Sequence, residues 1–332
     1  MRYLVTGGAG FIGSHLADAL LERGDEIVAL DDLSTGSTDN LMHLRETPGF
    51  TFRQGTILDH TLVTQLAAEA DVVVHLAAAV GVKLIVERPL ESLITNIRGT
   101  EIVLDAAAAA GCKVLVTSTS EIYGKNANGA LREDADRILG SPFKARWSYS
   151  TAKAVDEILA HAYWHDRGLP IVVVRLFNCI GPRQTGEFGM VVPRFVRQAL
   201  RGEDLTIYGD GEQRRCFCHV EDTVRALLAL LDHPGAVGEV FNVGSREEVT
   251  IAELADMVID MTGSPSRVVR IPYDEAYEQG FEDMLRRVPD TSKIAALTGW
   301  SPHRTLKDTL ADVIEHERRL LHLGVPVPDG SS

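Results

Sequence analysis

Two side chains four residues apart, Tyr149 and Lys153, could act together on an alcohol. The segment Tyr149-Ser-Thr-Ala-Lys153 places a phenol and an ammonium on one face of the helix that begins there. A nearby cation stabilises a phenolate and lowers the pKa of a tyrosine from its usual value of about 10. We therefore expect Tyr149 to be the base that removes an alcohol proton, with Lys153 as its cationic partner.

The same spacing also arises in an amphipathic helix with a surface lysine, so other signals have to support it. Val116-Thr-Ser-Thr-Ser-Glu-Ile-Tyr-Gly124 concentrates polar groups at the end of a predicted strand. Open parallel sheets bind their ligands at the carboxyl ends of their strands. Thr119 and Glu121 are therefore candidates for the same site.

A glycine-rich turn near the N-terminus has the spacing of a dinucleotide-binding loop. Thr6-Gly-Gly-Ala-Gly-Phe-Ile-Gly-Ser14 follows an apolar strand pattern and opens a helical one. Gly7, Gly10 and Gly13 fall where backbone would approach a pyrophosphate, which side chains would block. The helix N-terminus would favour an anion there.

The second predicted strand ends on two acids that indicate which dinucleotide binds. Asp31 lies about 20 residues beyond the glycine loop, where a carboxylate can accept hydrogen bonds from ribose hydroxyls. Asp31 and Asp32 would repel a 2′-phosphate, so we expect NAD rather than NADP. One of the two could be a solvated turn residue, and Asp31 is the preferred candidate. The positive nicotinamide ring would further lower the pKa of Tyr149.

The elements around these residues predict an α/β fold with a Rossmann-type, doubly wound parallel sheet and a smaller C-terminal α/β substrate domain. Short apolar runs indicate strands at 3–5, 26–30, 51–53, 72–76, 114–117 and 171–175, and helical patterns cover 12–21, 94–110, 152–165, 191–201, 220–231, 251–261 and 306–320. We expect residues 1–176, with 217–243, to form the NAD-binding domain. Residues 177–216 and 244–325 would form the substrate domain, and 326–332 a disordered tail.

Composition excludes several classes of function. A formal net charge of −14 argues against a general nucleic-acid or membrane-surface role, since both need clustered cations. No apolar run approaches the roughly 20 residues of a membrane span. The four cysteines lack metal-site spacing, so we predict reduced thiols and no metal. Met1 leads directly into a strand pattern, leaving no room for a secretion signal, so we expect a cytoplasmic protein.

The chain resembles the extended short-chain dehydrogenase/reductase superfamily through four segments: Thr6-Gly-Gly-Ala-Gly-Phe-Ile-Gly13, His75-Leu-Ala77, Tyr149-x-x-x-Lys153 and Arg175-Leu-Phe-Asn178. The resemblance implies that Thr119, Tyr149 and Lys153 act on the 4-hydroxyl of a nucleotide sugar while NAD takes hydride from C4. It also implies a homodimer through helices 94–110 and 150–166. Further contacts expected on this basis are Phe11, Ile12, Asp59, Leu76, Ala77 and Asn96 for the cofactor, and Ser120, Asn178, Val192, Arg215 and Arg287 for the substrate.

The residues that would act on C5 and C6 indicate which reaction follows C4 oxidation. Thr119-Ser120-Glu121 resembles UDP-glucuronate decarboxylases and GDP-mannose dehydratases, whereas simple 4-epimerases usually carry a small or neutral residue in place of Glu121. Arg146-Trp-Ser-Tyr149 resembles a bacterial decarboxylase domain, and Thr185 stands where hexuronate 4-epimerases tend to carry an arginine.

Two segments depart from the xylose-forming decarboxylases, which usually read Tyr-Asp-Glu-Gly-Lys at 149–153 and Pro-Pro-x-Tyr at 79–83. We nevertheless predict a UDP-glucuronate decarboxylase that gives UDP-4-keto-xylose, UDP-xylose or both. The alternatives are a UDP-glucuronate or UDP-glucose 4-epimerase, a 4,6-dehydratase, and an NAD-binding sensor without activity.

Overall fold

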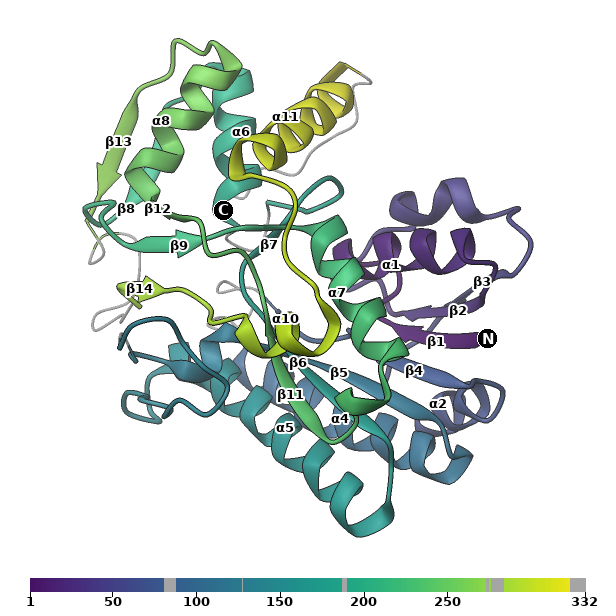
Figure 1. Ribbon diagram of the computed structural model, residues 1–332. Helices are drawn as coiled ribbons and strands as arrows, with labels where there is room; N and C mark the ends of the chain where they lie inside the picture. The colour runs from purple at the N-terminus through teal and green to yellow at the C-terminus, as the bar shows by residue number, and fades with distance from the viewer. Residues whose placement is uncertain (81–87, 127, 187–189, 273–274, 276–283, 323–332) are drawn as a thin grey trace.

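Seven parallel strands form the central sheet of the computed structural model, in the order β11-β6-β5-β4-β1-β2-β3 (Figure 1). The structure describes residues 1–80, 88–126, 128–186, 190–272, 275 and 284–322. The strands are β1 (Arg2–Thr6), β2 (Glu26–Asp31), β3 (Phe50–Gln54), β4 (Val72–His75), β5 (Lys113–Thr119), β6 (Ile171–Leu176) and β11 (Glu239–Val243). The predicted fold class is confirmed, and β11 adds an edge strand beyond the six expected.

Helices cover both faces of this sheet, which explains why its strands are apolar on both sides. All four residues of β4 are buried. One face carries α1 (Phe11–Glu22), α7 (Val220–Asp232) and α10 (Ser292–Thr298), and the other carries α2 (His60–Ala67), α4 (Pro89–Ala110) and α5 (Ser148–Arg167) (Figure 1). The result is the doubly wound arrangement.

Two helices begin earlier than the apolar pattern predicts. Helix α4 starts at Pro89 rather than at residue 94. The ring of proline already holds a helical φ, and the first position of a helix needs no amide hydrogen bond. Helix α5 starts at Ser148 rather than at residue 152. As expected, α4 ends at Gly111, whose φ of 73° is left-handed.

A smaller layer packs above the carboxyl ends of the strands. Its helices α6 (Val191–Arg201), α8 (Ile251–Thr262) and α11 (Leu306–His322) share a second core that includes Phe195, Leu254 and Leu310. The short strands β8 (Leu205–Tyr208) and β13 (Val268–Ile271) pair in parallel, and β9 (Arg214–Cys216) lies between β12 (Glu248–Thr250) and β14 (Arg286–Arg287). The strands β7 (Cys179–Ile180) and β10 (Cys218–His219) pair where the chain passes between the two layers.

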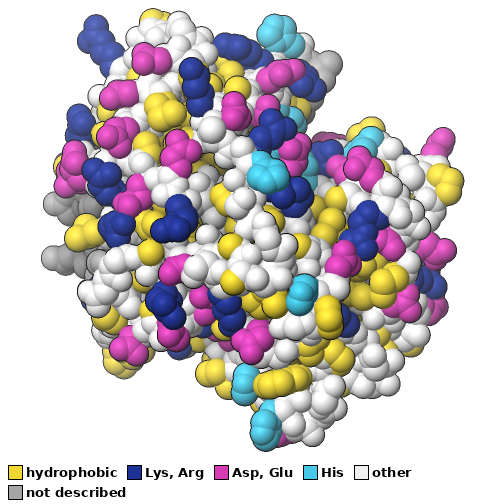
Figure 2. Space-filling view, in the orientation of Figure 1, with side chains coloured by type: hydrophobic (Ala, Val, Ile, Leu, Met, Phe, Trp, Pro, Cys, Tyr) yellow, Lys and Arg dark blue, Asp and Glu magenta, His cyan; other side chains and the backbone are white. Residues whose placement is uncertain are grey.

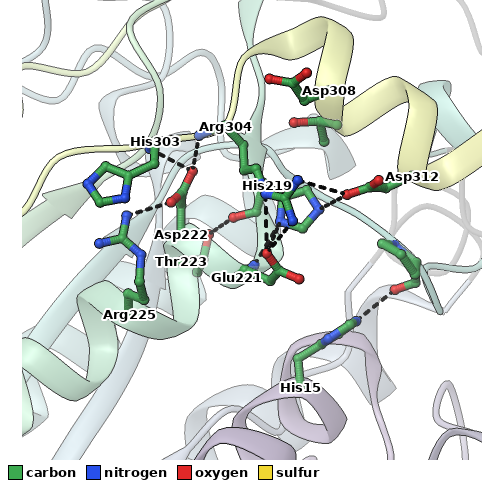
Figure 3. Close-up of polar contacts among 12 residues, drawn as sticks. His15, His219, Glu221, Asp222, Thr223, Arg225, His303, Arg304, Asp308 and Asp312 are labelled. Carbon is green, nitrogen blue, oxygen red and sulfur yellow. Dashed lines mark hydrogen bonds and ion pairs between the residues drawn. The ribbon is translucent and has the colours of Figure 1, made fainter.

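Buried polar contacts join α7 to the segment that leads into α11 (Figure 3). The Asp222 carboxylate accepts hydrogen bonds from the backbone N–H groups of His303 and Arg304, each at 3.0 Å. His219, at the start of α7, has its Nε2 3.3 Å from the Asp312 carboxylate on α11. These contacts attach the smaller layer to the sheet.

Acidic and basic side chains are mixed over the face of the molecule that Figure 2 shows. None of the helices in the described part of the chain has the length and apolar character of a membrane span. The four cysteines are free thiols, as predicted.

Candidate active site

A cavity of about 900 Å³ lies between the carboxyl ends of β1, β4, β5 and β6 and the smaller layer. This volume is at the upper end of the range of about 300–1,000 Å³ that ligand sites occupy. Most residues predicted for the site line it: Gly7, Gly10, Phe11, Ile12, Gly13, Asp31, Asp32, Leu76, Ala77, Thr119, Ser120, Glu121, Tyr149, Lys153, Asn178, Val192, Arg215 and Arg287.

The glycine loop lacks side chains for two reasons. Gly7 and Gly13 pack too closely against backbone to carry a Cβ, and Gly10 leaves the start of α1 open to the cavity. A Cβ on Gly13 would lie 2.2 Å from the Gly7 carbonyl oxygen, and a Cβ on Gly7 would lie 2.7 Å from the Ala77 nitrogen. Gly10 is the N-cap of α1 and has no side chain to cap the helix. The first-turn amides of α1 lack intrahelical partners, and their residues line the cavity. This loop fits the pyrophosphate of a dinucleotide.

Asp31 connects the glycine loop to the end of β2. Its Oδ2 accepts a hydrogen bond from the Ala9 N–H at 2.9 Å and its Oδ1 accepts one from the Leu33 N–H at 2.8 Å. Burial raises the pKa of this carboxyl, although these amides oppose the shift. The carboxylate also lines the cavity, where it can accept a hydrogen bond from a ribose hydroxyl.

Charge divides the cavity into two ends. Asp31, Asp32 and Glu91 lie at the end built from the glycine loop and α4. At the other end, Glu121 is the only acid among the described lining residues after position 100, and six arginines line the same region: Arg146, Arg183, Arg194, Arg197, Arg215 and Arg287. The second end therefore suits a strongly anionic ligand such as a diphosphate.

Thr119 and Lys153 are held in place by the end of β5. The Thr119 hydroxyl oxygen accepts the Glu121 N–H at 3.2 Å, so its own hydrogen remains to donate into the cavity. Lys153 Nζ donates to the Thr117 carbonyl at 2.9 Å. Tyr149 lies one turn before Lys153 on α5 and lines the same cavity.

The predicted lowering of the Tyr149 pKa includes the charge of bound nicotinamide and stays a prediction, since the groups of the chain itself act in the opposite direction. Burial raises the pKa of this phenol, the carboxylates of Glu121 and Asp156 raise it further, and Arg287 only partly opposes them. A bound cation would have to supply the lowering, since the positive charge of oxidised nicotinamide favours the phenolate.

Glu121 lies between two arginines. Arg146 donates to both carboxylate oxygens, at 2.6 and 3.1 Å, and Arg287 Nη1 lies 3.4 Å from Oε1. Burial would raise the pKa of Glu121, but the two guanidinium charges lower it to about 2. Arg287 also donates to Asn178 Oδ1 at 2.7 Å. The site therefore contains a cluster of one carboxylate and two guanidinium groups rather than an isolated carboxylate.

Two predicted cofactor residues do not line the cavity. Asp59 is the N-cap of α2, and its side chain accepts the Leu62 N–H at 3.0 Å, while Ile57 from the same loop lines the cavity instead. Asn96 is buried behind the wall, where its amide bonds both the N–H and the carbonyl of Ala79. We therefore correct these two assignments to supporting roles.

The sequence-based site omitted Arg146 and Arg183, which line the cavity. The position of Arg146, three residues before Tyr149, was a signal for its inclusion. No comparable pattern marks Arg183, which follows Gly181 and Pro182 in a turn.

A model of the NAD-dependent epimerase/dehydratase family matches residues 3–244. The chain belongs to this family. As a family member it is an enzyme with NAD as its cofactor, as predicted, and the glycine loop and the cavity fit that cofactor.

Relatives of this family member include decarboxylases and epimerases. It is 40% identical to a UDP-N-acetyl-alpha-D-glucosaminuronate decarboxylase from Bacillus cytotoxicus over 96% of this chain and 98% of the relative. It is 35% identical to UDP-glucuronic acid decarboxylase 1 from Arabidopsis thaliana over 96% of this chain and 70% of the relative. A solved UDP-glucuronic acid 4-epimerase from Bacillus cereus, in complex with UDP-glucuronic acid and NAD, superposes with a TM-score of 0.88 at 32% identity, covering 96% of this chain and 100% of the other.

Proposed function

We propose that this enzyme oxidises C4 of UDP-glucuronate and removes C6 as carbon dioxide. The observation that carries the proposal is Glu121 held between Arg146 and Arg287, at the cationic end of a cavity that Thr119 and Tyr149 also line. Two curated relatives that span nearly the whole chain are named as hexuronate decarboxylases, which supports the same conclusion.

The first step is oxidation of the alcohol. Tyr149 accepts the proton of the C4 hydroxyl, Thr119 donates a hydrogen bond to O4, and Lys153 stabilises the phenolate. Bound NAD supplies the acceptor for the C4 hydride. The product of this step is a C4 ketone, which makes the C6 carboxylate part of a β-keto acid.

Decarboxylation then needs little further activation. The C5–C6 bond breaks, carbon dioxide leaves, and the electron pair moves into an enolate whose charge rests on O4. Thr119 and Tyr149 lie where they can stabilise that charge by hydrogen bonding. Protonation of C5 gives UDP-4-keto-xylose. If hydride then returned to C4 from the bound reduced cofactor, Tyr149 would return its proton to O4 and the product would be UDP-xylose.

Epimerisation is the second candidate, favoured by the superposition on the Bacillus cereus 4-epimerase. Against it, the cavity is lined by Thr185 where hexuronate 4-epimerases tend to carry an arginine. A 4,6-dehydratase and an NAD-binding sensor are further alternatives. Incubation with NAD and a panel of nucleotide sugars, followed by chromatography and mass spectrometry, separates all four. A decarboxylase converts UDP-glucuronate with loss of carbon dioxide, and a 4,6-dehydratase converts a nucleotide hexose with loss of water. An epimerase gives a product of unchanged mass that chromatography resolves, and a sensor converts none.

An N-acetylated substrate has its own support, since the Bacillus cytotoxicus relative is named for one. An acetamido group at C2 leaves the chemistry at C4 and C6 unchanged. Parallel turnover of UDP-glucuronate and UDP-N-acetylglucosaminuronate, compared as kcat/KM, decides which is preferred.

We also propose a cytoplasmic homodimer that pairs α4 and α5 of each subunit. These two helices pack side by side on one face of the sheet (Figure 1). They carry apolar side chains that remain exposed in the single chain, namely Leu90 (71%), Ile94 (43%) and Ile158 (65%). Burying such side chains in a subunit interface is favourable.

A further inference from the structure

Behind the cavity, Lys153 forms an ion pair with a carboxylate that has no part in the scheme above. Lys153 Nζ lies 3.1 Å from Asp156 Oδ2, and the two side chains are 2% and 0% exposed. The ammonium also donates to the Thr117 carbonyl. Because an ammonium has three hydrogens, one remains for the cavity that Lys153 lines.

A row of buried polar side chains leads from Asp156 toward the wall of the cofactor site. The Thr100 hydroxyl interacts with the Asp156 carboxylate and favours its charged form. Thr100 Oγ1 lies 3.0 Å from His75 Nε2, and His75 Nδ1 lies 2.8 Å from Thr6 Oγ1. Thr6 Oγ1 in turn accepts the Ala77 N–H at 3.3 Å. Thr6, His75, Thr100 and Asp156 are each at most 1% exposed.

One direction of hydrogen bonding satisfies the whole row. Burial, helped by the charge of Lys153, lowers the pKa of His75 to about 3, so its ring is neutral. A neutral imidazole donates from one nitrogen and accepts at the other. The donors therefore run from Ala77 N–H to Thr6, from Thr6 to Nδ1, and from Nε2 to Thr100. The Thr100 hydrogen then remains for the Asp156 carboxylate, whose charged form it favours.

The ion pair matters because neither partner is stable alone at this depth. Burial raises the pKa of Asp156, and the Lys153 charge and the Thr100 hydroxyl oppose that shift. An uncompensated ammonium in the same place would favour loss of its proton. Asp156 is thus the buried counter-charge of the Lys153 ammonium.

We propose that Asp156 is a positioning residue that keeps Lys153 protonated and directed at the cavity, and that Thr100 and His75 connect this ion pair to the cofactor wall. The inference rests on the role proposed above for Lys153. The charged and titratable groups that interact with the pair are Tyr149 and Glu157 from α5 and His75 from β4.

Stability as a function of pH tests the ion pair without any turnover. In Asp156→Asn the buried ammonium is unpaired, so the native state binds protons less readily than the unfolded chain. We expect a melting temperature below that of the parent at pH 7, with the deficit narrowing as the pH rises to about 10, where the unfolded lysine also loses its proton. Glu157→Gln is the matched control, because it breaks the neighbouring ion pair with Arg175 on the same helix and should give a deficit that does not narrow.

Turnover tests the positioning role. With UDP-glucuronate, Asp156→Asn should lower kcat by roughly 10²-fold, as small misplacements of catalytic groups do. In the pH profile of kcat, the variant should also move the alkaline limb to a pH lower by about one to three units. The KM for UDP-glucuronate should change little. Thr100→Val removes the hydroxyl that favours the charged carboxylate, so the acidic limb should move up. Glu157→Gln removes a carboxylate that raises the pKa of Asp156, so it should move the acidic limb down, opposite to Thr100→Val, and leave the alkaline limb unmoved.

The outcomes separate the two proposals. A parent enzyme without turnover would refute the proposed function, and the melting series would still decide the ion pair. Asp156 only fills the core if two results are found together in an active enzyme. The melting temperature of Asp156→Asn would lie below that of the parent by the same amount at every pH, and both limbs of its kcat profile would stay at the parental pH values. If Asp156→Asn does not fold, Thr100→Val decides the question. An acidic limb of its kcat profile at the parental pH would overturn the proposal.

Discussion

Arg146 and Glu121 form a bidentate ion pair, with nitrogen–oxygen distances of 2.6 and 3.1 Å, directly beside the candidate catalytic residues. Arg146 precedes Tyr149 by three residues and Glu121 follows Thr119 by two. Because Arg146 and Arg287 both face the Glu121 carboxylate, this group would repel a substrate carboxylate only weakly. Its stronger effect is to orient Arg146 and Arg287.

Replacing Glu121 by Gln should slow carbon dioxide release by on the order of 10²-fold while UDP-glucuronate and NAD still bind. The variant keeps the shape of the side chain but loses the charge that holds the two guanidinium groups. Trapping of labelled carbon dioxide measures the rate. Arg146→Lys should behave similarly, since an ammonium cannot replace a bidentate fork. Release at the parental rate would reduce Glu121 to a structural part of the turn after β5.

Tyr149→Phe should abolish nearly all turnover and leave NAD affinity unchanged, because only the phenolic proton acceptor is removed. Titration of the cofactor by calorimetry and turnover of UDP-glucuronate are the two measurements. An active Phe variant would assign the base to another residue.

Asp31→Ala should weaken NAD binding and relax discrimination against NADP, since both the ribose acceptor and its repulsion of a 2′-phosphate are lost. It should also lower stability, because the Ala9 and Leu33 amides lose their acceptor. The ratio of the NAD and NADP dissociation constants is the readout. Asp32→Ala is the matched control, and a change of preference there alone would transfer the role to Asp32.

Asp222 should contribute stability that disappears in acid. Burial opposes its ionisation, but hydrogen bonds from Arg225, Arg304 and His303 outweigh burial and lower its pKa. A lowered folded pKa gives stability that is complete above the unfolded value of about 3.9 and is lost as the pH falls through the folded value. Asp222→Asn should therefore reduce the free energy of unfolding by about 2 kcal/mol relative to the parent near neutrality. Below about pH 4 the reduction should be smaller, because the parent then also loses the Asp222 charge.

Urea unfolding of the parent and of Asp222→Asn across this pH range measures the difference. Asp256→Asn, at an exposed position on α8, supplies the control and should change little at any pH. A difference independent of pH would exclude the carboxylate charge as its source.

Ile158→Glu should turn the proposed dimer into a monomer at micromolar concentration. Ile158 is 65% exposed on α5 in the single chain, so a charge there would disturb only an interface. Light scattering gives the mass, and circular dichroism checks that the fold is kept. A parent protein that is already monomeric would contradict the proposed assembly.

The sequence by itself determined the cofactor half of the molecule. Strand patterns such as 72–76 and the glycine loop depend on contacts close along the chain, so local spacing predicts them. Tyr149 and Lys153 share one helix, and Thr119 and Glu121 share one strand end. Each pair is therefore set by local geometry, and each lines the cavity as expected.

Only the tertiary structure decided how these groups are charged and supported. Arg287 reaches Glu121 and Asn178 because β14 pairs with β9, a contact between distant segments. Asp59 was assigned to the cofactor, but it caps α2. The groups of the chain raise the pKa of Tyr149, because burial and the carboxylates of Glu121 and Asp156 outweigh the charge of Arg287. Burial and long-range electrostatics depend on the packing of the whole chain, which spacing along the sequence does not contain.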